Sequence, residues 1–246
     1  MSDTINLQDL LRRAFQSQIE LGMNECVISP ENLKNKTLAI QSEAQVVTPQ
    51  QALGNSQETT AAFPSLEAHK DAICNCQLCP LGKTRNKFVY GVGNPNADIL
   101  FIGEAPGADE DRLGEPFVGR AGQLLDKILA AIQMSRQTVY IANILKCRPP
   151  QNRDPQPDEM ELCFPYLYEQ VHLIKPKLIC TLGRIASQAL LKTTTPLGKL
   201  RNNWQFFEDI PVIVTYHPAA LLRFPSYKRD TWEDMKKLKA KYESMI

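Results

Sequence analysis

Apolar residues follow two different spacings along the chain from about residue 66 onward. Short runs of consecutive apolar residues predict buried strands over 97–103, 138–145, 178–182 and 212–216. Apolar residues that recur every three or four positions predict helices over 66–73, 121–133, 157–174, 185–191 and 231–242. Within 157–174, Pro165 lacks a backbone N–H and should kink or break the helix.

The alternation of these strands and helices predicts the fold class. Parallel strands need crossover connections, which are usually helices, and these helices then cover both faces of the sheet. We therefore expect an α/β protein with three layers, α/β/α. Its central sheet should be mainly parallel and contain about four strands.

The first 65 residues differ from the rest of the chain. Apolar positions at Leu7, Leu11 and Phe15 predict one amphipathic helix over 5–21, and a polar stretch over 27–63 is typical of a flexible linker. We expect a flexible extension over 1–65 and a folded domain over 66–246. A single helix of this length is marginal alone in water, so its apolar stripe should pack on the chain's own domain or on a protein partner.

Charge and composition indicate where in the cell the protein is expected, but they do not identify a substrate. The net charge is +1, with −3 over residues 1–65 and +4 over the remainder, so the folded domain is only mildly basic. No apolar run is long enough to cross a membrane, and the first residues lack the basic and apolar regions of a signal peptide. We expect a cytoplasmic protein with no membrane contact.

Three polar residues stand where predicted strands end. Glu104 directly follows the first strand, Asn143 lies near the end of the second, and His217 directly follows the last. In a doubly wound sheet, sites form outside the carboxyl ends of the strands. Each residue alone has an ordinary explanation as a loop cap or a satisfied structural group. Their joint placement favours a functional site.

Seven cysteines in a cytoplasmic chain predict metal ligation better than disulfides. Cys76 and Cys79 form a CxxC pair, and thiolates at this spacing bind zinc or an iron–sulfur cluster, which the spacing alone does not separate. Cys74 is close enough to compete as a ligand. Cys180 lies in an apolar strand and should be a core residue. Cys26 has no other cysteine near it in the sequence.

Four segments of the chain resemble the motifs of family 4 uracil-DNA glycosylases and occur in that family's order. They are Gly103 to Asp111, Gly114 to Gly122, Asn143 to Arg153 and His217 to Arg223. The resemblance covers roughly residues 70–245, so the extension lies outside it. Four ordered motifs are a specific signal.

The resemblance implies a monofunctional DNA repair enzyme that flips uracil out of DNA and hydrolyses its N-glycosidic bond, leaving an abasic site. By similarity, Phe117 stacks on the flipped base and Asn143 binds its polar edge. His217 donates to the uracil oxygen on which negative charge grows. Glu104 is the carboxylate expected to stabilise the oxocarbenium-like sugar or to position water.

The same resemblance assigns further contacts with the substrate. Ala105 stands where family 1 enzymes have an aspartate, and Glu110 matches a pocket position that excludes thymine. Asp109 and Asp111 are expected to be solvated. The DNA-intercalation loop should insert a wedge and meet phosphates through these residues: Leu221, Leu222 and Arg223.

The resemblance also decides between zinc and an iron–sulfur cluster, which the spacing of the cysteines did not separate. It implies a structural 4Fe–4S cluster with four ligands: Cys76, Cys79, Cys147 and Cys163. The expected partner is uracil-containing DNA, single- or double-stranded, and the protein is expected to be a monomer.

Two other functions remain open from the sequence alone. The chain could be an iron–sulfur DNA-binding module without catalysis, although Glu104, Asn143 and His217 together argue against this. It could also be a related glycosylase that prefers another deaminated base, which depends on residues of the pocket wall.

Overall fold

A computed structural model of the protein describes residues 62–246. The helix predicted over 5–21 and most of the polar stretch lie outside these residues, so the division at residue 65 stays a prediction. The described elements are, in chain order, α2 (Leu66–Ile73), α3 (Leu81–Thr84), β1 (Val92–Gly93), β2 (Ile99–Gly103), α4 (Ala108–Leu113), α5 (Arg120–Ala131), β3 (Tyr140–Asn143), the 3₁₀ helix η2 (Pro150–Asn152), α6 (Pro157–Ile174), β4 (Leu178–Leu182), α7 (Arg184–Leu191), α8 (Leu197–Leu200), β5 (Gln205–Phe207), β6 (Ile210–Thr215), α9 (Pro218–Arg223) and α10 (Tyr227–Glu243).

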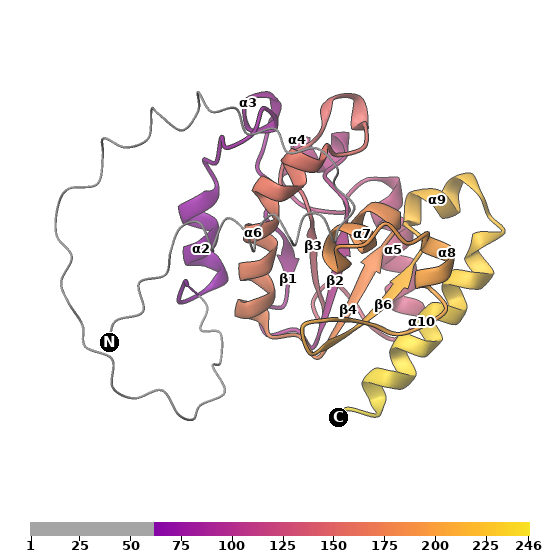
Figure 1. Ribbon diagram of the computed structural model, residues 1–246. Helices are drawn as coiled ribbons and strands as arrows, with labels where there is room; N and C mark the ends of the chain where they lie inside the picture. The colour runs from indigo at the N-terminus through magenta and orange to yellow at the C-terminus, as the bar shows by residue number, and fades with distance from the viewer. Residues whose placement is uncertain (1–61) are drawn as a thin grey trace, which may run out of the picture. The chain divides into compact units, whose positions relative to one another are not determined.

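A single sheet runs through the described domain in the order β1-β3-β2-β4-β6-β5 (Figure 1). The four central strands are parallel, and the two edge strands pair antiparallel with their neighbours. The register places Gly103 beside Asn143 and Leu182 beside Thr215. The carboxyl ends of the central strands therefore meet at one edge of the sheet.

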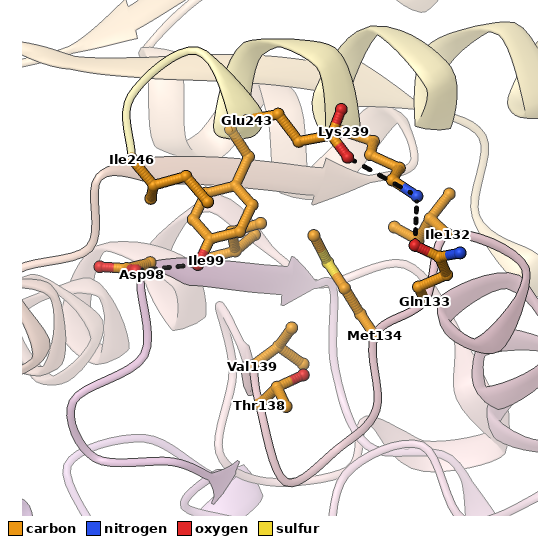
Figure 2. Close-up of a pocket in the computed structure, with 11 residues that line it drawn as sticks. Asp98, Ile99, Ile132, Gln133, Met134, Thr138, Val139, Lys239, Glu243 and Ile246 are labelled. Carbon is orange, nitrogen blue, oxygen red and sulfur yellow. Dashed lines mark hydrogen bonds and ion pairs between the residues drawn. The ribbon is translucent and has the colours of Figure 1, made fainter.

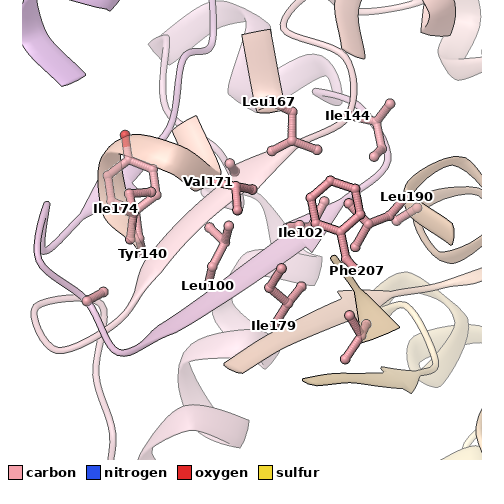
Figure 3. Close-up of a cluster of buried hydrophobic side chains, with 14 residues drawn as sticks. Leu100, Ile102, Tyr140, Ile144, Leu167, Val171, Ile174, Ile179, Leu190 and Phe207 are labelled. Carbon is pink, nitrogen blue, oxygen red and sulfur yellow. The ribbon is translucent and has the colours of Figure 1, made fainter. Parts of the chain in front are cut away.

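Alternating side chains of the buried strands pack on opposite faces, which produces three layers. On one face, Leu100 and Ile102 contact apolar residues of α6 and α7, among them Leu167, Val171 and Leu190 (Figure 3). Helix α2 adds Leu66 at the margin of this cluster. All of these contacts remove apolar surface from water, which is the main force that holds the layers together.

The other face of the sheet carries the second half of the core. Ile99 and Phe101 pack there against Leu125 and Leu129 of α5 and against Leu238 of α10. Because both faces are covered, the central strands are apolar at nearly every position, as is typical of parallel sheets. The predicted α/β class and its three layers are confirmed.

Two features of the described elements differ from the prediction. Two short antiparallel edge strands, β1 and β5, extend the predicted sheet to six strands. Helix α6 runs unbroken through Pro165, which lies on the exposed face together with Glu161, so the carbonyl that loses its partner faces water. Among the described helices, none combines the length and the hydropathy of a membrane span.

Candidate active site and cysteine pocket

The carboxyl ends of β2 and β3 and the segment after β6 bring the predicted site residues together. A Cβ atom on Gly103 would lie 2.4 Å from the Asn143 Oδ1 and 2.6 Å from the Phe117 ring. The Phe117 ring centroid in turn lies 5.5 Å from that of His217, with the rings tilted by 31°. A side chain at position 103 would clash with the Asn143 amide and the Phe117 ring, so glycine is required there, and the His217 imidazole lies next to that ring.

Asn143 is the most deeply placed polar group of this set. The residue is 2% exposed, and its Oδ1 has no hydrogen-bond partner among the described residues. Its backbone carbonyl accepts a 2.7 Å hydrogen bond from the Nζ of Lys146, which is itself completely buried. An unpaired buried acceptor is costly, about 1–3 kcal/mol, so such atoms commonly await a ligand donor.

Phe117 is held in a backbone conformation that non-glycine residues rarely adopt. Its φ is +55°, and its carbonyl accepts a hydrogen bond from the Arg136 guanidinium, which also donates to the Pro116 carbonyl at 3.0 Å. A Cβ on Gly122 would lie 1.8 Å from the same Phe117 carbonyl. Strained backbone of this kind persists only where its surroundings enforce it, and it is concentrated at functional sites.

Glu110 organises the loop that carries Phe117. One carboxylate oxygen accepts from the N–H groups of Val118 and Gly119, both at 2.9 Å, and the other accepts from Gly107 at 3.1 Å. The bonds from Val118 and Gly119 tie α4 to the start of α5, and the bond from Gly107 caps the N-terminus of α4. The role of Glu110 in excluding thymine stays a prediction.

His217 is fixed in one tautomer by its own helix. The N–H of Ala219 donates to the His217 Nδ1 at 3.1 Å, and a backbone N–H is only a donor, so Nδ1 carries the lone pair. The proton of the neutral ring is then on Nε2. Burial, supported by the nearby Arg223 and opposed by Glu110, lowers the pKa of His217 to about 4. At neutral pH the ring is an uncharged donor.

Glu104 directly follows β2 and is partly buried. Burial and, to a smaller extent, the nearby Asp154 raise the pKa of its carboxyl, Arg184 opposes both, and the pKa is about 7. Arg184 and Asp154 form an exposed ion pair at 2.8 Å. A carboxyl group with a pKa near neutrality is typical of groups that act in acid–base or charge-stabilising chemistry.

The two aspartates next to Glu110 differ in their surroundings. Asp111 is buried rather than solvated, so that prediction is wrong. Its carboxylate accepts from the backbone N–H of Asn86 at 2.8 Å and from the Asn86 side chain at 2.6 Å, which anchors α4. Asp109 is exposed and pairs with Arg112, as expected. Ala105 packs against the cluster that contains Cys147, and its contact with substrate stays a prediction.

The three residues of the predicted DNA-intercalation loop form part of α9. Leu221 is 2% exposed and faces the interior, whereas Leu222 is 41% exposed and Arg223 is also at the surface. Only Leu222 and Arg223 are therefore free to meet DNA without rearrangement. Leu221 instead anchors the helix that follows His217.

The four predicted metal ligands line one pocket between α3 and α6. Its walls include Cys76, Cys79, Cys147 and Cys163. Donors already point at the sulfur atoms: Arg85 at Cys147 (3.0 Å), Tyr166 at Cys76 (3.2 Å) and the Lys146 N–H at Cys163 (3.4 Å). Hydrogen bonds to the sulfurs are a feature of iron–sulfur sites, where they compensate thiolate charge.

The remaining described cysteines do not belong to this pocket. Cys74 is outside its walls and its thiol donates to the Asp71 carbonyl, while Cys180 is fully buried in the core, as predicted. Cys26 lies outside the described residues. Over residues 62–246, no three His, Cys, Asp or Glu side chains are grouped closely enough to hold a single ion. The fit to a cluster rests on the shared pocket and its sulfur-directed donors.

A separate hollow of about 280 Å³ lies at the opposite, amino end of the strands (Figure 2). The hydroxyl of Tyr242 donates to Asp98 at 3.0 Å on one side, and Lys239 donates to Gln133 at 2.7 Å on the other. Its position at the amino end of β2 separates it from Asn143 and His217. The catalytic candidates therefore lie elsewhere than this hollow.

Comparison with known proteins agrees with the motifs. A sequence profile of the uracil DNA glycosylase superfamily matches residues 90–236. The type-4 uracil-DNA glycosylase of Archaeoglobus fulgidus is 47% identical over 174 residues, which cover 68% of this chain and 87% of that protein. The chain belongs to the type-4 branch of the uracil DNA glycosylase superfamily. The type-4 enzyme of Saccharolobus solfataricus is 44% identical over 71% of this chain and 85% of its own length. The resemblance drawn from the motifs is confirmed.

Within this family fold, the structure reveals positioning residues that the sequence patterns did not assign. Arg136 contacts Phe117 across 19 residues of chain, and no local pattern indicates such a contact. Lys146 interrupts the apolar run around Ile144 and Leu145, which is the one signal that could have marked it. It links Asn143 to Gln170 of α6 through a 2.5 Å bond to the side-chain carbonyl.

Proposed function

We propose that the protein removes uracil from DNA by hydrolysis of the N-glycosidic bond and leaves an abasic site. The observation that carries this function is the unpaired, buried Oδ1 of Asn143, which lies with the Phe117 ring against Gly103, while the His217 imidazole lies next to that ring. An acceptor in that place suits the N3–H of a uracil stacked on Phe117. The type-4 uracil-DNA glycosylases to which the chain is similar support the same reaction.

The amide of Asn143 also explains discrimination between bases. Its oxygen accepts from N3–H, and its nitrogen donates to O4 of uracil. Cytosine presents an acceptor at N3 and a donor at C4, so both hydrogen bonds would be lost and buried groups left unpaired. A site of this type discriminates by roughly 10⁴–10⁵.

His217 and Glu104 act on the two charges that develop as the bond breaks. The electron pair of the C1′–N1 bond moves to uracil, and the Nε2–H of neutral His217 donates to the oxygen where the charge collects. The sugar becomes oxocarbenium-like, and ionised Glu104 stabilises it or positions the water whose oxygen bonds to C1′. Phe117 holds the base in place during this step.

An assay for released base tests this function directly. The purified protein should release free uracil from uracil-containing oligonucleotides in the presence of EDTA and without any added cofactor. The backbone should stay intact until alkali cleaves the abasic site. A requirement for magnesium, or a nicked strand before alkali, would contradict simple N-glycosyl hydrolysis.

The cysteine pocket supports a 4Fe–4S cluster as the resident cofactor. Cys76, Cys79, Cys147 and Cys163 would hold it, and Arg85 would compensate part of the thiolate charge. When bound, the cluster ties α3 and α6 to the segment after Asn143. Hydrolysis needs no electron transfer, so this role is structural.

The cellular location, the oligomeric state and the form of the DNA substrate are also part of the proposal. We expect a cytoplasmic monomer that acts on single- or double-stranded DNA. The predicted helix over 5–21 would serve to bind a protein partner or the chain's own domain. All of these expectations rest on the sequence, and the helix lies outside the described residues.

The raised pKa of Glu104 leads to a prediction about pH. Since the ionised carboxylate is the active form, kcat/KM should fall as pH decreases through about 7. Asp154→Asn removes a negative charge that raises this pKa and frees Arg184, so the acid limb should move to lower pH. Arg184→Gln should move it to higher pH.

The pH profiles of these variants between pH 5 and 9 check this assignment. In Glu104→Gln, the remaining activity should lose the acid limb. His217 titrates near pH 4 and does not contribute in this range. An acid limb that stays in place in both charge variants would exclude Glu104 as its source.

A further inference from the structure

An aromatic ring is exposed at the end of α9, the helix that follows His217. Phe224 is 54% exposed and follows Leu222, which is 41% exposed. The backbone of Phe224 is nevertheless fixed, because its N–H donates to Ala220 at 2.8 Å and its carbonyl accepts from Tyr227 at 3.1 Å. An exposed ring on a fixed backbone is preorganised for contact with a ligand.

Phe224 is the outer member of an aromatic ladder, which we define as Tyr216, Tyr227 and Phe224. The rings of Tyr216 and Tyr227 stack with centroids 4.1 Å apart and planes 2° apart. The Phe224 ring lies 5.6 Å from Tyr227 with a tilt of 50°. At the inner end, the Arg201 guanidinium lies 4.2 Å from the Tyr216 ring and is held by Asp234 at 2.9 Å. The ladder therefore leads from the interior to the surface.

Positive charge surrounds the exposed end of this ladder. Arg223, Lys228 and Arg229 are all exposed, and Arg229 has its side chain 88% exposed. Its nearest carboxylate is that of Asp230, at 4.0 Å, which is too long for a strong ion pair. Basic side chains interleaved with aromatic rings are typical of surfaces that bind single-stranded nucleic acid, where bases stack on the rings and phosphates meet the charges.

The ladder is also close enough to the pocket to contact the same DNA strand. Helix α9 separates His217 from Phe224, and six helical residues span about 9 Å. Stacked nucleotides rise about 3.4 Å each along a strand, so this span corresponds to a few nucleotides. A base that flanks the flipped uracil lies within reach of Phe224, provided that it is unpaired.

We propose that Phe224, at the outer end of the aromatic ladder, stacks on an unpaired base flanking the uracil and favours single-stranded substrate. This contact presupposes uracil excision by this chain as proposed above. The base lies over an exposed ring and its phosphate meets Arg223, Lys228 or Arg229. In a duplex the flanking bases are already paired and stacked, so the contact contributes less.

Steady-state kinetics on matched oligonucleotides test this contact. Phe224→Ala should raise KM for a single-stranded uracil 15-mer by about 5- to 150-fold, the range for loss of one base–aromatic stack. Turnover at saturation should stay the same, because Phe224 touches no reacting atom. KM for the duplex form should change less than that for the single strand. 2-Aminopurine placed within three positions of the uracil should show quenching that the variant loses.

Three further variants separate stacking from other roles of the side chain. Phe224→Trp should restore KM and quenching, while Phe224→Leu should resemble Phe224→Ala. Phe206→Ala, at an exposed ring on the edge strand β5, is the matched control and should behave like the wild type. Melting curves verify that α9 stays folded.

Each alternative outcome is distinguishable. A wild type that releases no uracil from either substrate contradicts the proposed function itself. A wild type that is active while Phe224→Ala leaves KM unchanged overturns base stacking. Equal KM values for Phe224→Leu and the wild type would show that Phe224 acts as an apolar wedge and not by stacking on a base. If Phe224→Ala changes only self-association, measured by light scattering, the surface binds a second copy of the chain and not DNA.

Discussion

Asn143→Ala and His217→Ala should each lower kcat by about 10²–10³, because each removes one preorganised interaction with the transition state. Asn143 provides a buried acceptor that is unpaired within the described domain. His217 provides an uncharged donor whose tautomer is fixed by the N–H of Ala219. Neither side chain contributes to the apolar core, so the loss should appear in turnover rather than in folding.

Single-turnover release of uracil is the measurement that isolates this step. His172→Ala is a matched control, because His172 lies on α6 and contacts Tyr168 and Glu208. It should keep the wild-type rate. Circular dichroism and iron content should be unchanged in both catalytic variants. Near wild-type rates in Asn143→Ala and His217→Ala together would place the active site elsewhere.

The central strands and the helices around them could be predicted because the spacing of their apolar residues, together with the length of each segment, indicates one type of element. Strand β4 is buried at every position and, apart from Thr181, consists of apolar residues, as expected for a strand covered on both faces. The edge strands β1 and β5 contain two and three residues, which is too short for any periodicity to appear. They form because neighbours in space offer unpaired backbone groups.

Without the family resemblance, the site could be predicted only in its parts that lie at strand ends. Glu104, Asn143 and His217 follow from the parallel topology, because carboxyl ends of parallel strands share one edge. The buried state of Asp111 could not be predicted, because it depends on Asn86, which is 25 residues away in sequence. The exposure of Phe224 depends likewise on how α9 packs, which buries Leu221 instead.

Substitution of a pocket cysteine should have the largest effect on stability. A cross-link that closes a loop of roughly 70 residues, such as that between Cys79 and Cys147, stabilises by about 4 kcal/mol in the chain-entropy model. For a domain of this size that corresponds to about 8–16 °C in Tm. Because four thiolates would share one cluster, loss of any one weakens the tie between α3, α6 and the segment after Asn143.

Cys76→Ser, Cys79→Ser, Cys147→Ser and Cys163→Ser should therefore each reduce iron from about four atoms per chain and bleach the absorbance near ~400 nm. Tm should fall with the iron content. Cys74→Ser should keep both, because that thiol lies outside the pocket, and Cys180→Ala is the control for loss of a buried thiol without loss of iron. Iron analysis, absorbance and melting of anaerobically purified protein provide the three readouts. Stoichiometric zinc in the wild type, or full iron content in the Cys147 and Cys163 variants, would contradict a 4Fe–4S cluster held by this pocket.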